Sequence, residues 1–77
     1  MGMYAPGDYV KVEFQDARSG HSEWMWVKVD RADDSERVVF GWLDNEPLVN
    51  TSLRLGQEIA MSYDLICEHM KTWAFAQ

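Results

Sequence analysis

The stretch WMWVKV, residues 24–29, contains two of the four tryptophans in the chain and its clearest two-residue alternation. Side chains leave opposite faces of a β-strand in turn, so this alternation predicts a strand with two unlike faces. One face is aliphatic and suits a core, whereas the other is aromatic and must be covered or displayed. The aliphatic set is Met25, Val27 and Val29, and the aromatic side carries Trp24, Trp26 and Lys28.

Three further segments predict strands around that stretch. Residues 9–14 and 59–63 alternate between apolar and polar positions, which is typical of half-buried strands. Residues 37–43 are apolar on both sides, which predicts a strand that lies centrally in the sheet, or a sheet that curls to cover both faces of this strand. Gly41 in that segment indicates a bend, or the close approach of a neighbouring side chain such as a tryptophan. Polar residues predict connectors at residues 15–22 and 30–36.

The chain is expected to end in a short helix. Ser62 or Asp64 can cap a helix that begins near Asp64. Four side chains then fall at helical spacing on one side, giving about two turns: Leu65, Ile66, His69 and Met70. Just before the last strand, Gly56 indicates a tight turn that requires an unusual φ.

These segments predict one mainly β domain over residues 1–77, α+β at the margin, with its core at about residues 8–70. The preferred architecture is a small curled antiparallel sheet, an SH3-like partly open barrel of four or five strands with a short C-terminal helix. Curling covers the two-sided third strand and shortens the exposed sheet edges. The alternative is an open sheet with the helix packed across one face.

The charge balance limits the classes of partner. The chain has 13 acidic and seven basic residues, a formal net charge of −6 at pH 7. Binding to phosphates draws on clustered Lys and Arg, so nucleic acid is not the expected partner. An acidic surface suits a basic protein surface, imitation of nucleic acid, or simple solubility. A second copy of the chain is a further candidate partner, because so small and aromatic a domain has little room to bury every ring.

The compartment follows from cysteine usage and from the apolar runs. The single cysteine, Cys67, allows no internal disulfide and fits a reducing compartment. The first residues lack the positive region and apolar run of a signal peptide. No apolar run approaches the roughly 20 residues that span a bilayer. The sequence therefore predicts a cytoplasmic protein without membrane contact.

Four segments in this order resemble a known family. They are residues 24–29, residues 41–47 (Gly-Trp-Leu-Asp-Asn-Glu-Pro), residues 53–59 (Leu-x-Leu-Gly-x-Glu-Ile) and Ile66. The chain resembles the YegJ-related family of small bacterial proteins, a domain of unknown function, over about residues 8–70. Residues 68–69 are Glu-His where that family usually has Asp-Trp, which indicates a divergent branch. The resemblance implies a bacterial, cytosolic, single-domain protein. Some relatives resemble immunity proteins, which neutralise a toxin by binding it.

The candidate partner-binding residues lie on the aromatic strand side and in the turn after residue 43. Tryptophans can line a groove for a proline-rich segment or a cation, or can form a second small core. The carboxylates and amide of the turn can hold a basic side chain or a hard cation. A calcium loop needs more oxygen ligands, and an ordinary turn is the other interpretation. The candidates are Trp24, Trp26, Trp42, Asp44, Asn45 and Glu46.

Catalytic chemistry has little support in the sequence. His21, Cys67 and His69 are the only nitrogen and sulfur candidates for a metal or nucleophilic site, and on a helix the last two would not share a face. A phosphate-binding glycine loop and a Ser-His-Asp signature are both missing. We predict no enzyme, no metal and no cofactor, but a protein-interaction module of unknown partner, such as an inhibitor or immunity-type protein. The alternative is a small ligand-binding or sensing domain with a pocket near the Asp44–Pro47 turn.

Overall fold

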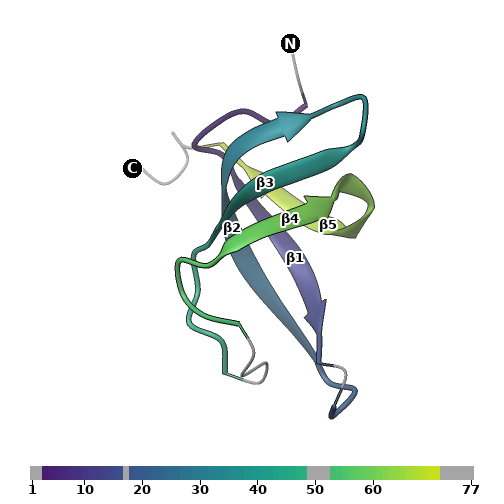
Figure 1. Cartoon of the computed structure of the whole chain (residues 1–77), viewed down its shortest axis with the longest axis vertical. Coiled ribbons are helices and arrows are strands. Elements are labelled where there is room, and N and C mark those ends of the chain that lie inside the picture. The colour runs from purple at the N-terminus through teal and green to yellow at the C-terminus, as the bar shows by residue number, and fades with distance from the viewer. Residues whose placement is uncertain (1–2, 17, 49–52, 72–77) are drawn as a thin grey trace.

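The computed structural model describes residues 3–16, 18–48 and 53–71. The strands are β1 (Tyr9–Gln15), β2 (Ser22–Asp33), β3 (Val38–Leu43), β4 (Glu58–Ser62) and β5 (Ile66–Met70), and a 3-10 turn, η1, covers Tyr63–Leu65. They form one antiparallel sheet in the order β4-β3-β2-β1-β5 (Figure 1). The sheet is not closed, because β4 and β5 are its two edges. The predicted mainly β, antiparallel fold is confirmed.

The stretch at residues 24–29 lies in β2, the middle strand of the sheet. In the register with β1, Val27 is opposite Val10, and in the register with β3 it is opposite Leu43. All three side chains are buried, and so are Met25 and Val29. The predicted aliphatic side is therefore the inner face of the sheet. Burying one such side chain contributes roughly 1.5–3 kcal/mol, so this face drives folding.

The sheet curls so that its two edges share one core. Figure 1 shows β4 crossing in front of β1 instead of lying parallel to it. Ile59 of β4 and Ile66 of β5 both pack against the buried cluster that includes Val10 and Val12 of β1. Strands at opposite edges can contact one cluster only if the sheet between them bends. The predicted curling is thus present, although the sheet does not close.

β2 is longer than the polar pattern of residues 30–36 predicts. It continues to Asp33 after the register with β3 shifts between Val29 and Arg31. The extra residue, Asp30, forms a bulge, and a bulge bends its strand and increases the local twist. The bulge therefore adds to the curl of the sheet at the β2–β3 hairpin.

Gly41 lies opposite Val29, at that bulge. A Cβ atom added to Gly41 would stand 2.1 Å from the backbone oxygen of Lys28. The close approach predicted at Gly41 exists, but the neighbour is the backbone of β2 and not a tryptophan. The unusual φ predicted for Gly56 is also confirmed, at 82°.

The predicted C-terminal helix is wrong, and the alternative fold that packs this helix on an open sheet fails with it. Ile66–Met70 form β5, and Ser62 caps only the single turn η1. A two-turn helix is not stable by itself in water. As a strand, the same segment pairs with β1, with Glu68 opposite Lys11, and satisfies backbone groups that would otherwise lie unpaired at the sheet edge. In the described part of the chain, no helix has the length and apolarity to cross a membrane.

Candidate functional site

Three of the tryptophans lie on the outer face of the sheet, opposite the core. Trp24 and Trp26 belong to β2, and Trp42 belongs to β3, where it is opposite Lys28. Trp24 is 53% exposed and Trp42 is 40% exposed, whereas Trp26 is half-buried. We call these three residues the aromatic face. β3 is an interior strand between β2 and β4, as one alternative predicted, but its outer face is not fully covered, because Trp42 faces solvent.

Basic side chains lie against three aromatic rings of the outer face. Cation–π contacts of this kind contribute about 0.5–1 kcal/mol at exposed sites and hold a ring in one orientation. The distances from cation to ring centre are 5.9 Å for Lys11 and Trp26, 6.0 Å for Lys28 and Tyr9, and 4.0 Å for Arg31 and Phe40. Three of the seven basic residues in this acidic chain thus lie on the same face as the tryptophans.

The turn at residues 44–46 comes after β3 in the chain and lies alongside β2. The backbone N–H of Trp26 donates to Oδ1 of Asn45, and the backbone N–H of Asp44 donates to the carbonyl of Trp26 at 2.8 Å. Asn45 therefore continues the ladder of β3 with its side chain, which is the ordinary-turn interpretation. The same bonds fix the backbone of Trp26 in the aromatic face. Asp44 and Glu46 are exposed.

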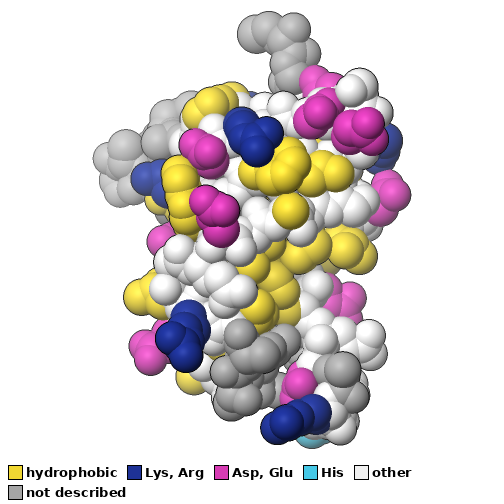
Figure 2. All heavy atoms as spheres, viewed as in Figure 1, with side chains coloured by type: hydrophobic (Ala, Val, Ile, Leu, Met, Phe, Trp, Pro, Cys, Tyr) yellow, Lys and Arg dark blue, Asp and Glu magenta, His cyan; other side chains and the backbone are white. Residues whose placement is uncertain are grey.

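A hollow of about 360 Å³ lies on the outer face over β3 and β4. The cross-strand pairs Phe40 with Ala60 and Trp42 with Glu58 both border it. Ala60, opposite Phe40, has only a methyl side chain and so takes little of the space above β4. In Figure 2, hydrophobic side chains and side chains of both charges lie together on the side of the molecule that carries β3 and β4. Trp42 thus belongs both to the aromatic face and to this hollow.

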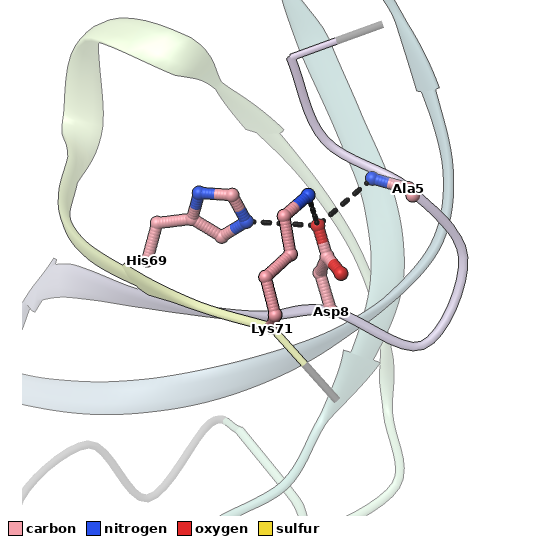
Figure 3. Close-up of polar contacts among 4 residues, drawn as sticks. All are labelled: Ala5, Asp8, His69 and Lys71. Carbon is pink, nitrogen blue, oxygen red and sulfur yellow. Dashed lines mark hydrogen bonds and ion pairs between the residues drawn. The ribbon is translucent and has the colours of Figure 1, made fainter. Parts of the chain in front are cut away.

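A second polar site, which the sequence did not predict, is centred on Asp8 just before β1. The Asp8 side chain is 5% exposed. Its Oδ2 accepts hydrogen bonds from the backbone N–H of Ala5 at 3.0 Å, from Nε2 of His69 at 2.8 Å and from Nζ of Lys71 at 2.9 Å (Figure 3). Burial by itself raises the pKa of the Asp8 carboxyl. The hydrogen bonds lower the pKa by more than burial raises it, so the pKa lies below its usual value.

Aromatic rings extend the site from His69, one of the hydrogen-bond donors to this carboxylate. The ring of Tyr4 lies edge-on to His69 at 4.7 Å and to Tyr63 at 4.8 Å between ring centres. The Tyr63 hydroxyl donates a hydrogen bond to Asp34, and burial together with this bond raises the pKa of Tyr63 to about 12. The cluster therefore joins the N-terminal turn, η1 and β5. An Asp–His pair can orient an imidazole for proton transfer. Here the same carboxylate oxygen also accepts hydrogen bonds from a lysine and a backbone N–H, which is typical of a contact that stabilises the fold.

Sequence reasoning missed this cluster for an identifiable reason. Asp8 precedes the first predicted strand and belongs to no motif, and the sequence predicts that His69 lies in a helix. As a strand opposite β1, residues 66–70 bring His69 next to Val10, two residues from Asp8. The signal that could have found the cluster is therefore the strand assignment of β5, not a motif.

The other nitrogen and sulfur candidates do not join it. His21 and Cys67 are both exposed. Within residues 3–16, 18–48 and 53–71, no group of three or more His, Cys, Asp or Glu side chains is arranged to hold a metal ion. The predictions of no metal and no enzyme stay predictions.

A protein-family model described as "Uncharacterized protein conserved in bacteria (DUF2314)" matches residues 5–76. The chain belongs to this family. Membership of DUF2314 confirms the expectation of an uncharacterised family of bacterial proteins, and the match covers every element of the sheet. No curated protein and no solved structure matches the chain.

Proposed function

We propose that this DUF2314 protein is a protein-interaction module that binds its partner through the aromatic face. The observation that carries the proposal is the exposure of Trp24 and Trp42 on one face of a sheet whose other face forms the core. Exposed aromatic patches mark interfaces, and tryptophan is enriched among the residues that dominate binding energy.

The surroundings of Trp26 support the same proposal. Lys11 lies over its ring, and Asn45 and Asp44 hold its backbone. A surface that is already ordered before binding loses less conformational entropy when a partner docks. The turn at residues 44–46 thus contributes by positioning the aromatic face, in addition to any contact that it makes itself.

An inhibitor or immunity-type protein in the bacterial cytoplasm is the form of module that we favour. Such a protein acts by occupying a partner's surface and needs no catalytic group. The formal net charge of −6 suits a partner with a basic surface, because opposite charges speed the encounter of two proteins.

Two narrower relationships belong to the proposal. The relation to the YegJ-related branch is supported by the Leu43–Pro47 segment. An SH3-like relationship is supported by the strand order and by the 3-10 turn between the last two strands.

The hollow over β3 and β4 favours a second candidate function, a small ligand-binding or sensing domain. Its volume of about 360 Å³ suits a small molecule, and Trp42 on its border is two residues from the Asp44–Pro47 turn. A thermal-shift screen against metabolites and metals separates the two candidates. A clear shift with a small molecule, and no protein partner, would favour the second.

The main test combines capture of a partner with a measured affinity. Immobilised protein is used to capture partners from a bacterial lysate, and the affinity of the purified partner is then measured by calorimetry. We expect Trp24→Ala and Trp42→Ala each to weaken binding about tenfold or more, or about 1.4 kcal/mol, because they remove central aromatic contacts. If the partner is a second copy of the chain, sedimentation will show a dimer that the same substitutions dissociate.

Leu65→Ala is the matched control. Leu65 is 48% exposed and lies in η1, outside the sheet. The substitution therefore removes an exposed apolar side chain that does not belong to the aromatic face. Its affinity should equal that of the wild type. If all three variants bind as the wild type does while their circular dichroism is unchanged, the aromatic face is not the interface.

A further inference from the structure

Trp42 differs from the rings around it in having no basic side chain against it. Trp26, Tyr9 and Phe40 of the outer face each have a cation–π contact, whereas in the described part of the chain none is made with Trp42. Its cross-strand neighbour Lys28 does not fill the position, because the Lys28 ammonium lies over Tyr9 of β1. The exposed indole of Trp42 is therefore open to a cation from outside.

Two carboxylates border the same hollow as that indole. Glu58 is the direct cross-strand partner of Trp42, and Asp30 is the bulge residue of β2. Both border the hollow. Among the residues that the structure describes, neither carboxylate makes a hydrogen bond or an ion pair, in contrast to Glu68, which pairs with Lys11 at 3.1 Å. The hollow thus combines an open aromatic ring with two unpaired negative charges.

The basic side chain inside the hollow is used in a different way. The Arg31 guanidinium lies 4.0 Å from the centre of the Phe40 ring, and this pair forms one wall. Trp42 and Glu58 form the other wall, two residues along β3 and β4 from the pair of Phe40 and Ala60. The recognition groups that remain free on the second wall are an indole face and a carboxylate, which together are complementary to a cation.

We propose that the hollow is a groove that receives a basic side chain, Arg or Lys, against its Trp42 and Glu58 wall, and that the protein partner presents this side chain. A cation over an indole contributes about 0.5–2 kcal/mol, and a carboxylate beside it adds charge-assisted hydrogen bonds. The net charge of −6 draws a basic partner surface towards the module. The inference rests on the proposed function, since it names what one tryptophan of the aromatic face recognises.

The experiment uses capped amino acids as probes and the intact protein as receptor. Two-dimensional NMR spectra are recorded during titration with N-acetyl-arginine methylamide, N-acetyl-lysine methylamide and, as the opposite charge, N-acetyl-glutamate methylamide. We expect saturable shifts of the Trp42 indole N–H and of the backbone amides of residues 30–31 and 58–60 with the basic probes. Glu58→Gln and Trp42→Ala should each weaken this binding about fivefold, the scale of one cation–π contact.

Glu36→Gln is the matched control, because Glu36 is exposed in the β2–β3 turn and does not border the hollow. It removes the same charge and should leave the binding of the basic probes unchanged. Equal weakening by Glu36→Gln and Glu58→Gln would mean that the net charge of the protein, and not the groove, attracts the basic probes. That result would overturn the proposal. If the glutamate probe binds in preference to the arginine probe, the groove recognises anions through Arg31, and the proposal is also overturned.

The two proposals fail in different ways. If Trp24→Ala weakens capture of the partner but no basic probe binds the groove, the groove inference is wrong and the interaction function stands. If the basic probes bind the groove but partner affinity is unchanged in both Trp24→Ala and Trp42→Ala, the interaction function of the aromatic face is wrong.

Discussion

The two faces of the sheet use large apolar residues for opposite purposes. On the inner face, Val27 and Leu43 are completely buried, whereas Trp24 and Trp42, on the same two strands, face solvent. One step along a strand separates a residue that stabilises the fold from one that is free to bind. Apolar character alone therefore does not assign a role; the side of the strand does. We expect the free energy of unfolding to depend on the inner face and partner affinity on the outer face.

The largest effect should come from the inner face. Leu43→Ala removes a buried side chain from the core and should lower the free energy of unfolding by about 2–5 kcal/mol. A domain of this size has roughly 3–5 kcal/mol in total, so much of the variant should be unfolded at 25 °C. Urea denaturation followed by tryptophan fluorescence measures the loss. A loss below about 0.5 kcal/mol, the range of ordinary surface substitutions, would contradict the division into two faces.

The next effect tests the packing of backbone against backbone. Gly41→Ala places a methyl group 2.1 Å from the Lys28 carbonyl oxygen. β2 and β3 must then separate at the bulge, at an expected cost of about 1–3 kcal/mol. Thermal denaturation followed by circular dichroism measures the change. A melting temperature equal to that of the wild type would mean that the strands do not approach so closely.

The Asp8 cluster provides a stabilising site that is polar. Asp8→Asn keeps the shape of the side chain but removes its charge from the hydrogen bonds with His69, Lys71 and Ala5. We expect the free energy of unfolding at pH 7 to fall by about 1–3 kcal/mol, as measured by urea denaturation.

The pH dependence of that loss has a defined sign. The folded pKa of Asp8 is lowered, so its charge stabilises the fold fully above the unfolded value, roughly 4, and less as the pH falls through the folded value. The difference between the wild type and Asp8→Asn should shrink as the pH falls below about 4. A difference that stays the same down to pH 3 would show that Asp8 acts through its shape alone.

The smallest effect on stability should come from the outer face. Trp24→Ala and Trp42→Ala remove exposed side chains, and each should change the free energy of unfolding by no more than about 0.5 kcal/mol. Trp26→Ala sharpens the comparison, because Trp26 is half-buried under Lys11 and should cost more than either. If Trp24→Ala destabilised the protein as much as Leu43→Ala, both faces would serve folding.

The elements differ in how far the sequence could predict them. The strand predicted at residues 24–29 is correct, because the alternation is long, and it pairs with β1, the strand that precedes it in the chain. The helix predicted after Asp64 is wrong, because four side chains over six residues do not distinguish a short helix from a strand. Whether this segment forms a helix or a strand depends on pairing with the open edge of β1, and the residues around Asp64 carry no information about that edge.

The sequence by itself determined which side chains share a face, because alternation is a property of neighbouring residues. It therefore identified Met25 and Val27 as core and Trp24 and Trp26 as a separate surface. Only the tertiary structure decided that this surface is displayed, that Asp8 meets His69 across 61 residues, and that Trp42 and Glu58 border one hollow. These outcomes depend on which strands pair and on how the sheet curls. Both are long-range choices, made by the free energy of the whole chain and not by any one segment of it.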